Sequence, residues 1–426
     1  MTGLRRFTSG TFRSMRSRNY RLFFYGQLIS TSGTWMQTVA LAWLVLRMTG
    51  SGFDVGLVTA LQFLPMLLIS SWGGVLADRL DKRRTLVVTQ CGMAVCAAGL
   101  AAVTLGGVAQ LWNLYLLTLA SGCFNAIDNP VRQAFLSEMV GVDDLPNAVS
   151  LNSAMFNTSR IIGPALGAVV IKLFDVGPCF AVNAVSFVAV IGGLVMMRRD
   201  ELFLGRPITR AKGQIREGLR YVWANIELRS TILVMAVVGT LAFNFTVVMP
   251  LLAKFTFHGD ATTYGLLTAL MGAGSMVGAL ATASRLRPTP RLLAGTCLAF
   301  GVVMTLAAVA PTLLSEKLLI VALGATSITF MSTANSTCQL TSSPEMRGRV
   351  MALYGVVFLG STPIGGPLIG WVSEQFGPRW GMGIGGVATI GSALVAGAVL
   401  VRRRAGVRRA ALDTAGEDLQ AHPAAV

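Results

Sequence analysis

The amino-acid sequence predicts an all-α membrane protein with twelve transmembrane helices in two six-helix pseudo-repeat halves. Composition is the first observation behind this prediction: of 426 residues, 53% are hydrophobic and only 13% are charged, and the mean hydropathy is +0.64. A soluble globular protein carries about 25% charged residues. The second observation is a series of apolar runs, each long enough for the roughly 20 residues that a helix needs to cross a bilayer.

Twelve such runs follow one another along the chain. The first has a basic flank, but its apolar part is too long for a cleaved signal peptide, so we expect it to be retained. Residues 86–127 contain no charge and are too long for one helix, and Gly106 and Gly107 mark the expected bend. The predicted spans are 22–46, 53–77, 86–107, 111–135, 148–172, 178–197, 230–253, 261–284, 292–315, 318–341, 350–373 and 379–401.

Lysine and arginine are distributed unevenly between the two sides of these spans. With the N-terminus in the cytoplasm, 29 of the 35 basic residues fall in cytoplasmic segments, five in outer segments and one, Arg160, inside a span. Membrane proteins carry such an excess in their short cytoplasmic loops. We therefore expect a multi-pass protein of the cytoplasmic membrane with both termini in the cytoplasm. The net charge of +16 then reflects topology, and nucleic acid is not expected as a partner.

The longest loop divides the chain. We expect an N-terminal six-helix half at 1–197, a cytoplasmic linker at 198–229, a C-terminal six-helix half at 230–401 and a disordered tail at 402–426, which is basic and then polar with Ala and Pro. Apolar residues at helical spacing in the linker predict an amphipathic helix on the inner membrane surface. They are Ile215, Leu219, Val222, Trp223 and Ile226.

The two halves resemble each other weakly in sequence. SAMFNTSRIIGPALG (153–167) matches GVVFLGSTPIGGPLIG (355–370), with Phe156 opposite Phe358 and Gly163 opposite Gly365. GGVLADRL likewise has a degraded counterpart in GALATASRL. A parallel repeat is typical of transporters whose substrate site lies near the midplane between two halves. Chance similarity between apolar sequences is the alternative.

A cluster of six charges between the second and third runs carries the most specific motif. Residues 74–86, GVLADRLDKRRTL, follow the pattern Gly, any residue, Leu, Ala, Asp, Arg, any residue, Gly, basic, basic, except that Asp81 replaces the second glycine. In this motif the chain resembles the major facilitator superfamily, and with twelve predicted spans the resemblance covers the whole chain. Aspartate is a tolerated second choice where a tight turn favours glycine.

The resemblance implies a cytoplasmic gate made of Gly74, Asp78, Arg79, Lys82 and Arg83. Gly74 allows another helix to approach closely. Asp78 can pair with a nearby arginine or lie at the N-terminus of a neighbouring helix. Such a cluster holds the two halves together while the cytoplasmic side is closed. The alternative, that the basic residues only set the topology, does not account for Asp78.

Three charges fall inside predicted spans. Asp128 and Arg132 are four residues apart and therefore share a helix face, and Arg160 lies near the middle of the fifth span. Each charge at this depth costs about 2.5–3.5 kcal/mol, which indicates a function. Asp128, the only carboxylate expected deep inside a span, could load and release a proton. A permanent ion pair between the fourth and fifth spans is the alternative.

A second motif resembles the Gly-Pro signature in the fifth span of superfamily exporters. In SRIIGPALGA (159–168), Gly163, Pro164 and Gly167 match, whereas Ser159 and Ala168 replace two family glycines. The proline kinks the helix, and the glycines allow tight helix contact. The resemblance implies export, and an ordinary kinked seam of small residues is the alternative.

Other polar residues inside the spans are candidates for a substrate cavity or for contacts between helices. They are Gln27, Trp35, Gln37, Asn125, Asn157, Asn244 and Asn335. Three acidic residues at the outer ends of spans are expected to be helix caps or interfacial charges: Asp54, Glu316 and Glu374. The six cysteines lie in apolar runs without the spacing of metal ligands, so we expect no metal.

The sequence thus predicts a secondary transporter that exports amphipathic small molecules by proton antiport with alternating access. The segments PNAVSLN and PEMRGRVMALY further resemble the branch of enterobactin exporters and multidrug efflux pumps. Two alternatives remain, a dedicated siderophore or metabolite exporter and a non-transporting scaffold or receptor. Without a P-loop or a catalytic triad, neither an ATP-driven pump nor an enzyme is expected. We expect no cofactor, and a monomer that contacts the lipid bilayer, protons and a small-molecule substrate.

Overall fold

The computed structural model describes residues 12–203, 214–283 and 289–421; among these, the side chains of 70–79, 214–215, 283, 290, 359 and 400–421 are not described. All regular secondary structure in the described part is helical. The elements are η1 (Arg13–Arg16), α2 (Arg18–Thr49), α3 (Gly52–Arg79), α4 (Lys82–Leu105), α5 (Leu111–Phe174), α6 (Gly177–Val195), η2 (Arg199–Glu201), α7 (Gln214–Ala224), α8 (Ile226–Leu241), α9 (Phe245–Leu251), the π-helical turn η3 (Leu252–Thr256), α10 (Ala261–Ala283), α11 (Pro290–Ala308), α12 (Leu313–Thr341), α13 (Pro344–Phe376) and α14 (Pro378–Ala421).

Ten helical segments of the described chain are long and apolar enough to cross a membrane. This count differs from the twelve predicted spans for two reasons. The predicted span 22–46 lies in α2, which is not one of the ten. The predicted spans 111–135 and 148–172 both lie in α5, a 64-residue helix that loses helical geometry at Gly141, where φ is 73° and ψ is 175°. Glycine adopts such a positive φ without steric cost.

The turn after α4 lies where the sequence predicts a bend. α4 stops at Leu105, and Gly107 has a φ of +69°, which confirms the predicted bend. The turn after α3 differs from expectation. Asp81 has an extended backbone with φ of −61°, and its carboxylate accepts a hydrogen bond from the Arg84 N–H at 3.0 Å. Asp81 is therefore an N-cap of α4 and not a substitute for a glycine turn.

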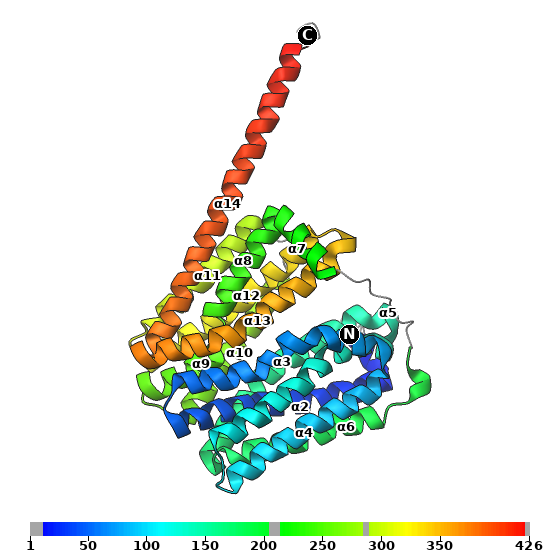
Figure 1. Cartoon of the computed structure of the whole chain (residues 1–426), viewed down its shortest axis with the longest axis vertical. Helices are drawn as coiled ribbons and strands as arrows, with labels where there is room; N and C mark the ends of the chain where they lie inside the picture. The colour runs from blue at the N-terminus through cyan, green and yellow to red at the C-terminus, as the bar shows by residue number, and fades with distance from the viewer. Residues whose placement is uncertain (1–11, 204–213, 284–288, 422–426) are drawn as a thin grey trace, which may run out of the picture.

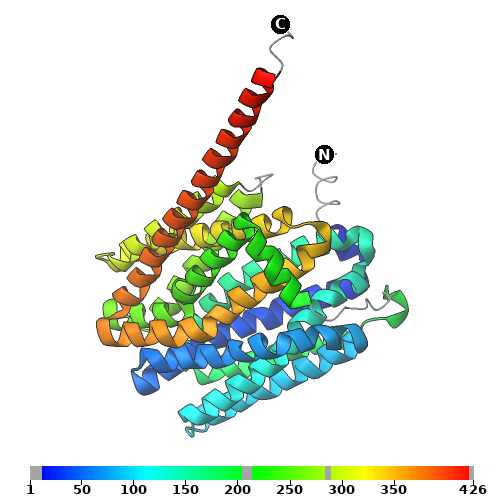
Figure 2. The same ribbon diagram turned by 45° about the horizontal axis from the view of Figure 1, so that its top comes forward.

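Two other segments differ from the predictions. The predicted span 230–253 is broken into α8, α9 and η3. The tail at 402–426 was expected to be disordered, but α14 continues as a helix to Ala421 and extends beyond the other helices (Figures 1 and 2). Residues 402–421 are rich in Ala and Arg and contain no proline, and these two residue types have high helix propensity.

For description we divide the helices into an N-terminal bundle (α2–α6) and a C-terminal bundle (α8–α14). Figure 1 shows the N-terminal bundle below the C-terminal bundle. The two bundles meet mainly where α3 packs on α13 and α5 packs on α10. Linker helix α7 packs on α13, with Val222 fully buried and Trp223 exposed, whereas Ile226, predicted to belong to the same helix, begins α8.

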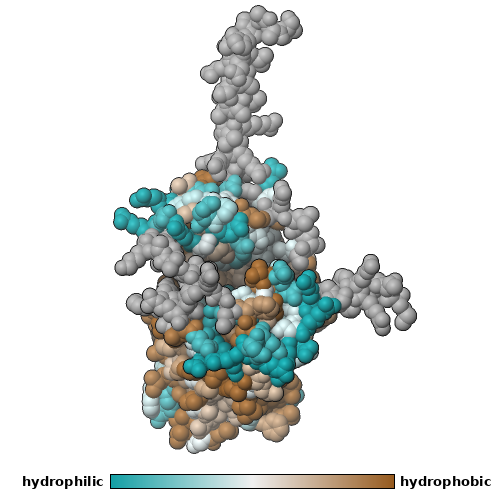
Figure 3. Space-filling model, turned by 90° about the vertical axis from the view of Figure 1, so that its right-hand side faces the viewer, coloured by the Kyte–Doolittle hydropathy of each residue, from teal (hydrophilic) through white to brown (hydrophobic). Residues whose placement is uncertain are grey.

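Each bundle has two ends, which we name by their connections. The linker end carries the start of α2, the turn between α3 and α4, and helix α7, whereas the far end carries the turns between α2 and α3 and between α13 and α14. Figure 3 views the linker end, where hydrophilic residues gather over both bundles.

Glycines allow the bundles to touch near the far end. A Cβ atom on Gly52 or Gly370 would clash with the backbone of the other residue, and the same holds for Gly56 and Gly366. α3 and α13 therefore lie in backbone contact here. Only glycine permits this approach without movement of one helix.

The glycines of the weak sequence repeat make equivalent contacts. Gly163 on α5 packs against the carbonyl of Ser32 on α2, and Gly365 on α13 packs against the carbonyl of Thr240 on α8. In each case the glycine of the fifth predicted span of a half contacts the first predicted span of the same half.

Candidate functional site

A buried carboxylate lies at the centre of the N-terminal bundle. Asp128 on α5 is only 1% exposed. Its Oδ1 accepts hydrogen bonds from Thr89 Oγ1 at 2.8 Å and from Gln90 Nε2 at 2.9 Å, both on α4. Its Oδ2 lies 3.5 Å from Arg132 Nε, which confirms the predicted pairing on one helix face. Three polar partners offset the loss of hydration that burial of a charge imposes.

Arg132 connects this carboxylate to α2. Its Nη1 donates to Gln27 Oε1 at 3.2 Å, and its Nη2 donates to Asn129 Oδ1 at 2.6 Å. Asn129 in turn donates to Asn125 Oδ1 at 3.0 Å. The resulting polar network joins α2, α4 and α5, so that a change at Asp128 acts on three helices at once.

Arg160 lies apart from this network. Its guanidinium carbon is 5.3 Å from the ring centroid of Trp35, a cation–π arrangement, and Trp35 also packs edge-on against Phe156. No carboxylate among the described residues forms an ion pair with Arg160, so the structure does not pair it with Asp128. The Arg160 backbone lies against Gly272 of α10, which places this residue where the two bundles meet.

The Gly-Pro motif lies at the same junction. Gly163 packs against Ser32 and Trp35 of α2, and a Cβ atom on Gly265 of α10 would lie 2.9 Å from the Pro164 carbonyl. Gly167 lies against Met36. The motif thus allows α5 to contact α2 on one side and α10 on the other.

Two basic residues of the expected gate, Lys82 and Arg83, contact the N-terminal bundle. Lys82 Nζ lies 2.6 Å from Glu138 Oε1, and both side chains are mostly buried. Arg83 donates to the carbonyls of Leu194 and Val195 at 2.6 and 2.7 Å, where α6 ends. A cation is stabilised at a helix C-terminus.

The other gate residues are Gly74, Asp78 and Arg79, on the last turns of α3. The surroundings of Gly74 and the side chains of Asp78 and Arg79 lie outside the described residues. Ion pairs between described residues at the linker end stay within one bundle or its adjoining linker segment; examples are Arg13 with Asp144 and Arg349 with Glu217.

A polar contact joins the bundles at the far end instead. Glu374 of α13 accepts hydrogen bonds from the Ser51 hydroxyl at 2.6 Å and from the Phe53 N–H at 3.1 Å. Ser51 also accepts from the Asp54 N–H at 3.2 Å, as expected of a residue that starts a helix. Glu374, predicted to be a helix cap or an interfacial charge, therefore also connects α13 to the start of α3.

The other predicted cavity residues form hydrogen bonds away from Asp128 and Arg160, and the Oδ1 atom of Asn244 has no hydrogen-bond partner among the described residues. Gln37 accepts from Asn183 at 2.7 Å, and Asn335 accepts from Gln339 at 2.6 Å. Asn157 and Asn244 donate to carbonyls four residues earlier, those of Ser153 and Thr240. Of the seven candidates, only Gln27, Trp35 and Asn125 join the surroundings of Asp128 or Arg160.

Sequence reasoning missed four polar residues. Thr89 and Gln90 lie in an uncharged apolar run. The only sequence signal for a functional role is that two polar residues stand side by side in this run. Glu138 is the partner of Lys82. Glu316, expected at an interface, is instead 0% exposed, and neither carboxylate oxygen has a hydrogen-bond partner among the described residues. Asp128 is therefore not the only buried carboxylate.

No group of three or more His, Cys, Asp and Glu residues in the described part of the chain could hold a metal ion. All six cysteines are free thiols, four of them buried. These cysteines serve as small apolar packing residues.

Known proteins resemble this chain over most of its length. A family model described as a transmembrane secretion effector, MFS_3, matches residues 9–421. The multidrug efflux pump Tap of Mycolicibacterium fortuitum is 27% identical, with 84% of this chain and 89% of Tap covered. The staphyloferrin A transporter of Staphylococcus aureus is 23% identical over 61% of this chain, and the match spans 66% of that transporter, just under two thirds of its length.

A solved structure resembles the fold. A bacterial homologue of the human lysosomal transporter Spinster, in an inward-facing and unoccupied conformation, superposes with a TM-score of 0.69 at 15% identity, with 89% of this chain and 96% of that chain covered. At this identity the similarity concerns the fold alone.

Proposed function

Since the chain belongs to the transmembrane secretion effector family of the major facilitator superfamily, and is thus a membrane transporter and not an enzyme, we propose that it exports amphipathic small molecules by proton antiport. The relatives named as a multidrug efflux pump and as a siderophore transporter support an export role. The observation that carries the proposal is the buried Asp128, held by Thr89, Gln90 and Arg132.

The proposed architecture has twelve spans in two six-helix halves, with both termini in the cytoplasm. Counting α2 and the two parts of α5 on either side of Gly141 as spans supports this number. The excess of basic residues at the linker end supports the orientation. Contact of the bundles near the far end then corresponds to an inward-facing state, in which cargo enters from the cytoplasmic side.

Asp128 is the proposed site of proton exchange. As a carboxylate it is held by Arg132, and as a neutral acid it would release this arginine. A cargo molecule that carries a positive charge or a hydrogen-bond donor competes with the proton for the same oxygen atoms. Such competition is what antiport requires, because loading of one ligand expels the other.

A second candidate function is the export of an anionic chelator such as a siderophore. The observation that favours it is Arg160, which lies where the bundles meet and has no carboxylate partner among the described residues. An unpaired cation at membrane depth is a functional feature by default. In this case the cargo itself supplies the missing negative charge.

One experiment separates these functions. Inside-out vesicles that contain the wild-type protein, Asp128→Asn, Arg160→Gln or the control Asp260→Asn, a residue in the loop before α10, are energised with a proton gradient. Amphipathic cations, neutral drugs and siderophores are then added, while the gradient and labelled cargo are followed. For the antiporter we expect gradient collapse with cationic or neutral compounds in the wild type and in Asp260→Asn, and at least a tenfold loss in Asp128→Asn.

Other outcomes of this experiment would assign a different function to the protein. Uptake of siderophores that Arg160→Gln abolishes and Asp128→Asn preserves would favour the second function. Cargo movement without any gradient collapse would leave a facilitator in which Asp128 is structural. If no labelled compound crosses and Asp128→Asn leaves the cellular phenotype intact, the protein is a scaffold or receptor.

A further inference from the structure

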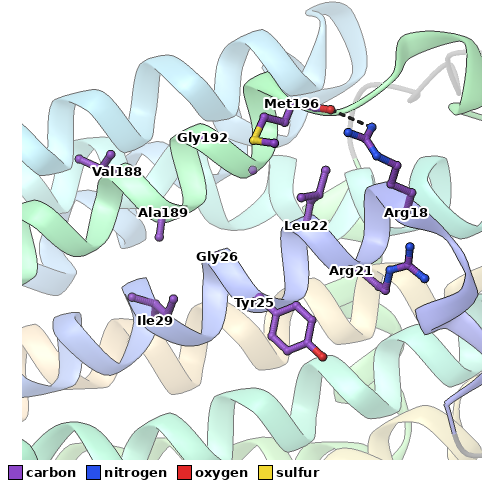
Figure 4. Close-up of a pocket in the computed structure, with 11 residues that line it drawn as sticks. Arg18, Arg21, Leu22, Tyr25, Gly26, Ile29, Val188, Ala189, Gly192 and Met196 are labelled. Atoms are coloured by element: carbon purple, nitrogen blue, oxygen red, sulfur yellow. Dashed lines mark hydrogen bonds between the residues drawn. The ribbon is translucent and has the colours of Figure 1, made fainter.

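A groove runs along the outer surface of the N-terminal bundle between α2 and α6. It encloses about 580 Å³ and begins at the linker end. Figure 4 shows Arg18 and Arg21 together at one end of the groove, with Ile29 and Val188 at the other. Its walls are otherwise apolar, and Ile29 and Val188 are more than half exposed. The groove therefore has a basic mouth and an apolar body.

Glycines form the floor of the groove. Gly26 and Gly193 bring α2 and α6 into backbone contact, because a Cβ atom on either would lie 2.8 Å from the other helix. Gly192 is different, since a Cβ atom there would meet no atom within 4 Å. The space above Gly192 is thus open to an external molecule.

The two arginines are available to a ligand. Arg18 donates one hydrogen bond to the Met196 carbonyl at 3.0 Å, and Arg21 donates one to the Met15 carbonyl at 3.3 Å. Neither forms an ion pair with a carboxylate of the described residues. Each guanidinium has five N–H donors in a planar fork that suits phosphate. Two adjacent, uncompensated cations favour an anionic partner.

The length of the groove matches the hydrocarbon thickness of one membrane leaflet. Arg18 and Ile29 are eleven residues apart on one helix, or about 16 Å at 1.5 Å per residue. One leaflet contributes about 15 Å of hydrocarbon. A molecule with a phosphate group at the arginines and acyl chains along the groove would lie as a lipid lies in the leaflet.

The C-terminal bundle has a second groove of the same design. This groove, about 410 Å³, lies between α8 and α14. Arg21, Tyr25 and Ile29 line the first groove at four-residue spacing, and Arg229, Leu233 and Val237 line the second at the same spacing. Arg21 and Arg229 are each the fourth residue of their helix.

The opposing helices of the two grooves match as well. The groove-lining residues on α6 and α14 recur at the same spacing. Val188, Ala189, Gly192, Gly193 and Met196 line the first groove, and Gly391, Ser392, Val395, Ala396 and Val399 line the second. Two stretches of chain with little sequence similarity thus keep an arginine at the mouth and the same spacing of lining positions on the opposing helix. This recurrence is an observation independent of the first groove.

We propose that these two grooves bind anionic phospholipids of the cytoplasmic leaflet, with the phosphate at Arg18 and Arg21 in the first and at Arg229 in the second. Basic pockets between transmembrane helices on the cytoplasmic side are suited to such headgroups. Zwitterionic lipids bind the same apolar walls but gain less from the arginines. This inference does not depend on which cargo the protein transports.

The test measures lipid binding directly. The full-length protein is purified in detergent, delipidated and titrated with phosphatidylglycerol or with phosphatidylcholine of the same acyl chains, and bound lipids are counted by native mass spectrometry. We expect up to two tightly bound phosphatidylglycerol molecules per chain and at least fivefold weaker binding of phosphatidylcholine. Equal binding of the two lipids would overturn the proposal.

Two kinds of variant locate the bound lipid. Arg18→Gln combined with Arg21→Gln should weaken phosphatidylglycerol binding at the first groove at least fivefold, whereas Arg216→Gln with Arg220→Gln on α7 should not. Gly192→Leu should fill the first groove without a clash and remove one lipid, whereas Gly295→Leu, at another open helical glycine, should remove none. Wild-type lipid counts in the groove variants would contradict the assignment.

Two further measurements separate lipid binding from misfolding and from the binding of a free anion. Thermal unfolding in the absence of lipid shows whether each variant is folded, so that loss of binding is not mistaken for loss of structure. Inorganic phosphate should fail to displace the lipid, because it cannot fill the apolar groove. Displacement by inorganic phosphate would overturn the proposal and reassign the arginines to a free anion.

Discussion

At the scale of single residues, burial decides what each charge does. Lys82 and Glu138 lie 2.6 Å apart with side chains only 18% and 9% exposed, whereas Arg198 and Glu201 form a pair that is 60% and 37% exposed. Removal of one partner from a buried pair leaves an uncompensated charge in a poorly hydrated site. Removal of one partner from an exposed pair leaves a charge that water still solvates.

This difference predicts how the two pairs respond to mutation. Glu138→Ala should destabilise the protein by about 3–5 kcal/mol, and the double substitution Lys82→Met with Glu138→Leu should restore most of the loss. Glu201→Ala, the matched control, should change stability by less than about 1 kcal/mol. Thermal unfolding in detergent measures all three. Equal destabilisation by Glu138→Ala and Glu201→Ala would show that burial of the first pair does not matter.

The sequence identified several of these residues but not their partners. Asp128 and Arg132 could be paired in advance, since four-residue spacing fixes a common helix face. Thr89 and Gln90 could not be assigned to Asp128, because that contact depends on how α4 packs on α5. An ion pair between the fourth and fifth spans was one of two alternatives for Asp128 and Arg160, and the structure places the Arg160 guanidinium over Trp35. Glu316 was expected at an interface and is fully buried.

At the scale of helices, the contact between α3 and α13 determines which end of the molecule is closed. Gly56 and Gly366 allow backbone contact, and Glu374 bonds to Ser51 and to the Phe53 N–H. In the proposed alternating-access cycle, these two helices separate at the far end. A covalent link across this contact should therefore block the cycle.

A cross-link tests this expectation. In a background without the six native cysteines, Ser51→Cys with Glu374→Cys should form a disulfide under mild oxidation and reduce transport at least tenfold, and a reductant should restore it. Each single cysteine variant serves as the control. Transport is followed with labelled cargo in vesicles. If the cross-linked protein still transports at the wild-type rate, the far end does not open during the cycle.

The helices themselves were largely predictable. The apolar runs, the bend at Gly106 and Gly107 and the linker helix all follow from hydropathy and local propensity. The break between α8 and α9, the helical continuation of α14 and the N-cap role of Asp81 differ from expectation. These features depend on backbone geometry and on the helix propensities of individual residues. A count of apolar residues contains neither.

At the scale of the whole molecule, the distribution of basic residues predicts the orientation. Arg84 is 75% exposed beside the turn between α3 and α4, and Val108 is 61% exposed after the other end of α4. If the linker end lies in the cytoplasm, these positions lie on opposite sides of the membrane.

Cysteine labelling checks the orientation. In the cysteine-free background, Val108→Cys should react with a membrane-impermeant maleimide in intact cells. Arg84→Cys should react at least tenfold less in intact cells and fully after permeabilisation. The reverse pattern would invert the topology, and would also move the two lipid grooves to the outer leaflet.

The membrane class, the family motif, the helix-forming segments and the grouping of basic residues can all be recognised from the sequence. These features are local or additive, since hydropathy, spacing and charge are properties of short stretches of chain. The tertiary packing, in contrast, sets which polar groups meet. It encloses Asp128 among α4 and α5 side chains, sets Arg160 on Trp35, brings α3 against α13 and forms two equivalent grooves. Each of these features joins residues from different helices. It therefore depends on how the helices pack against one another, which no single stretch of sequence encodes.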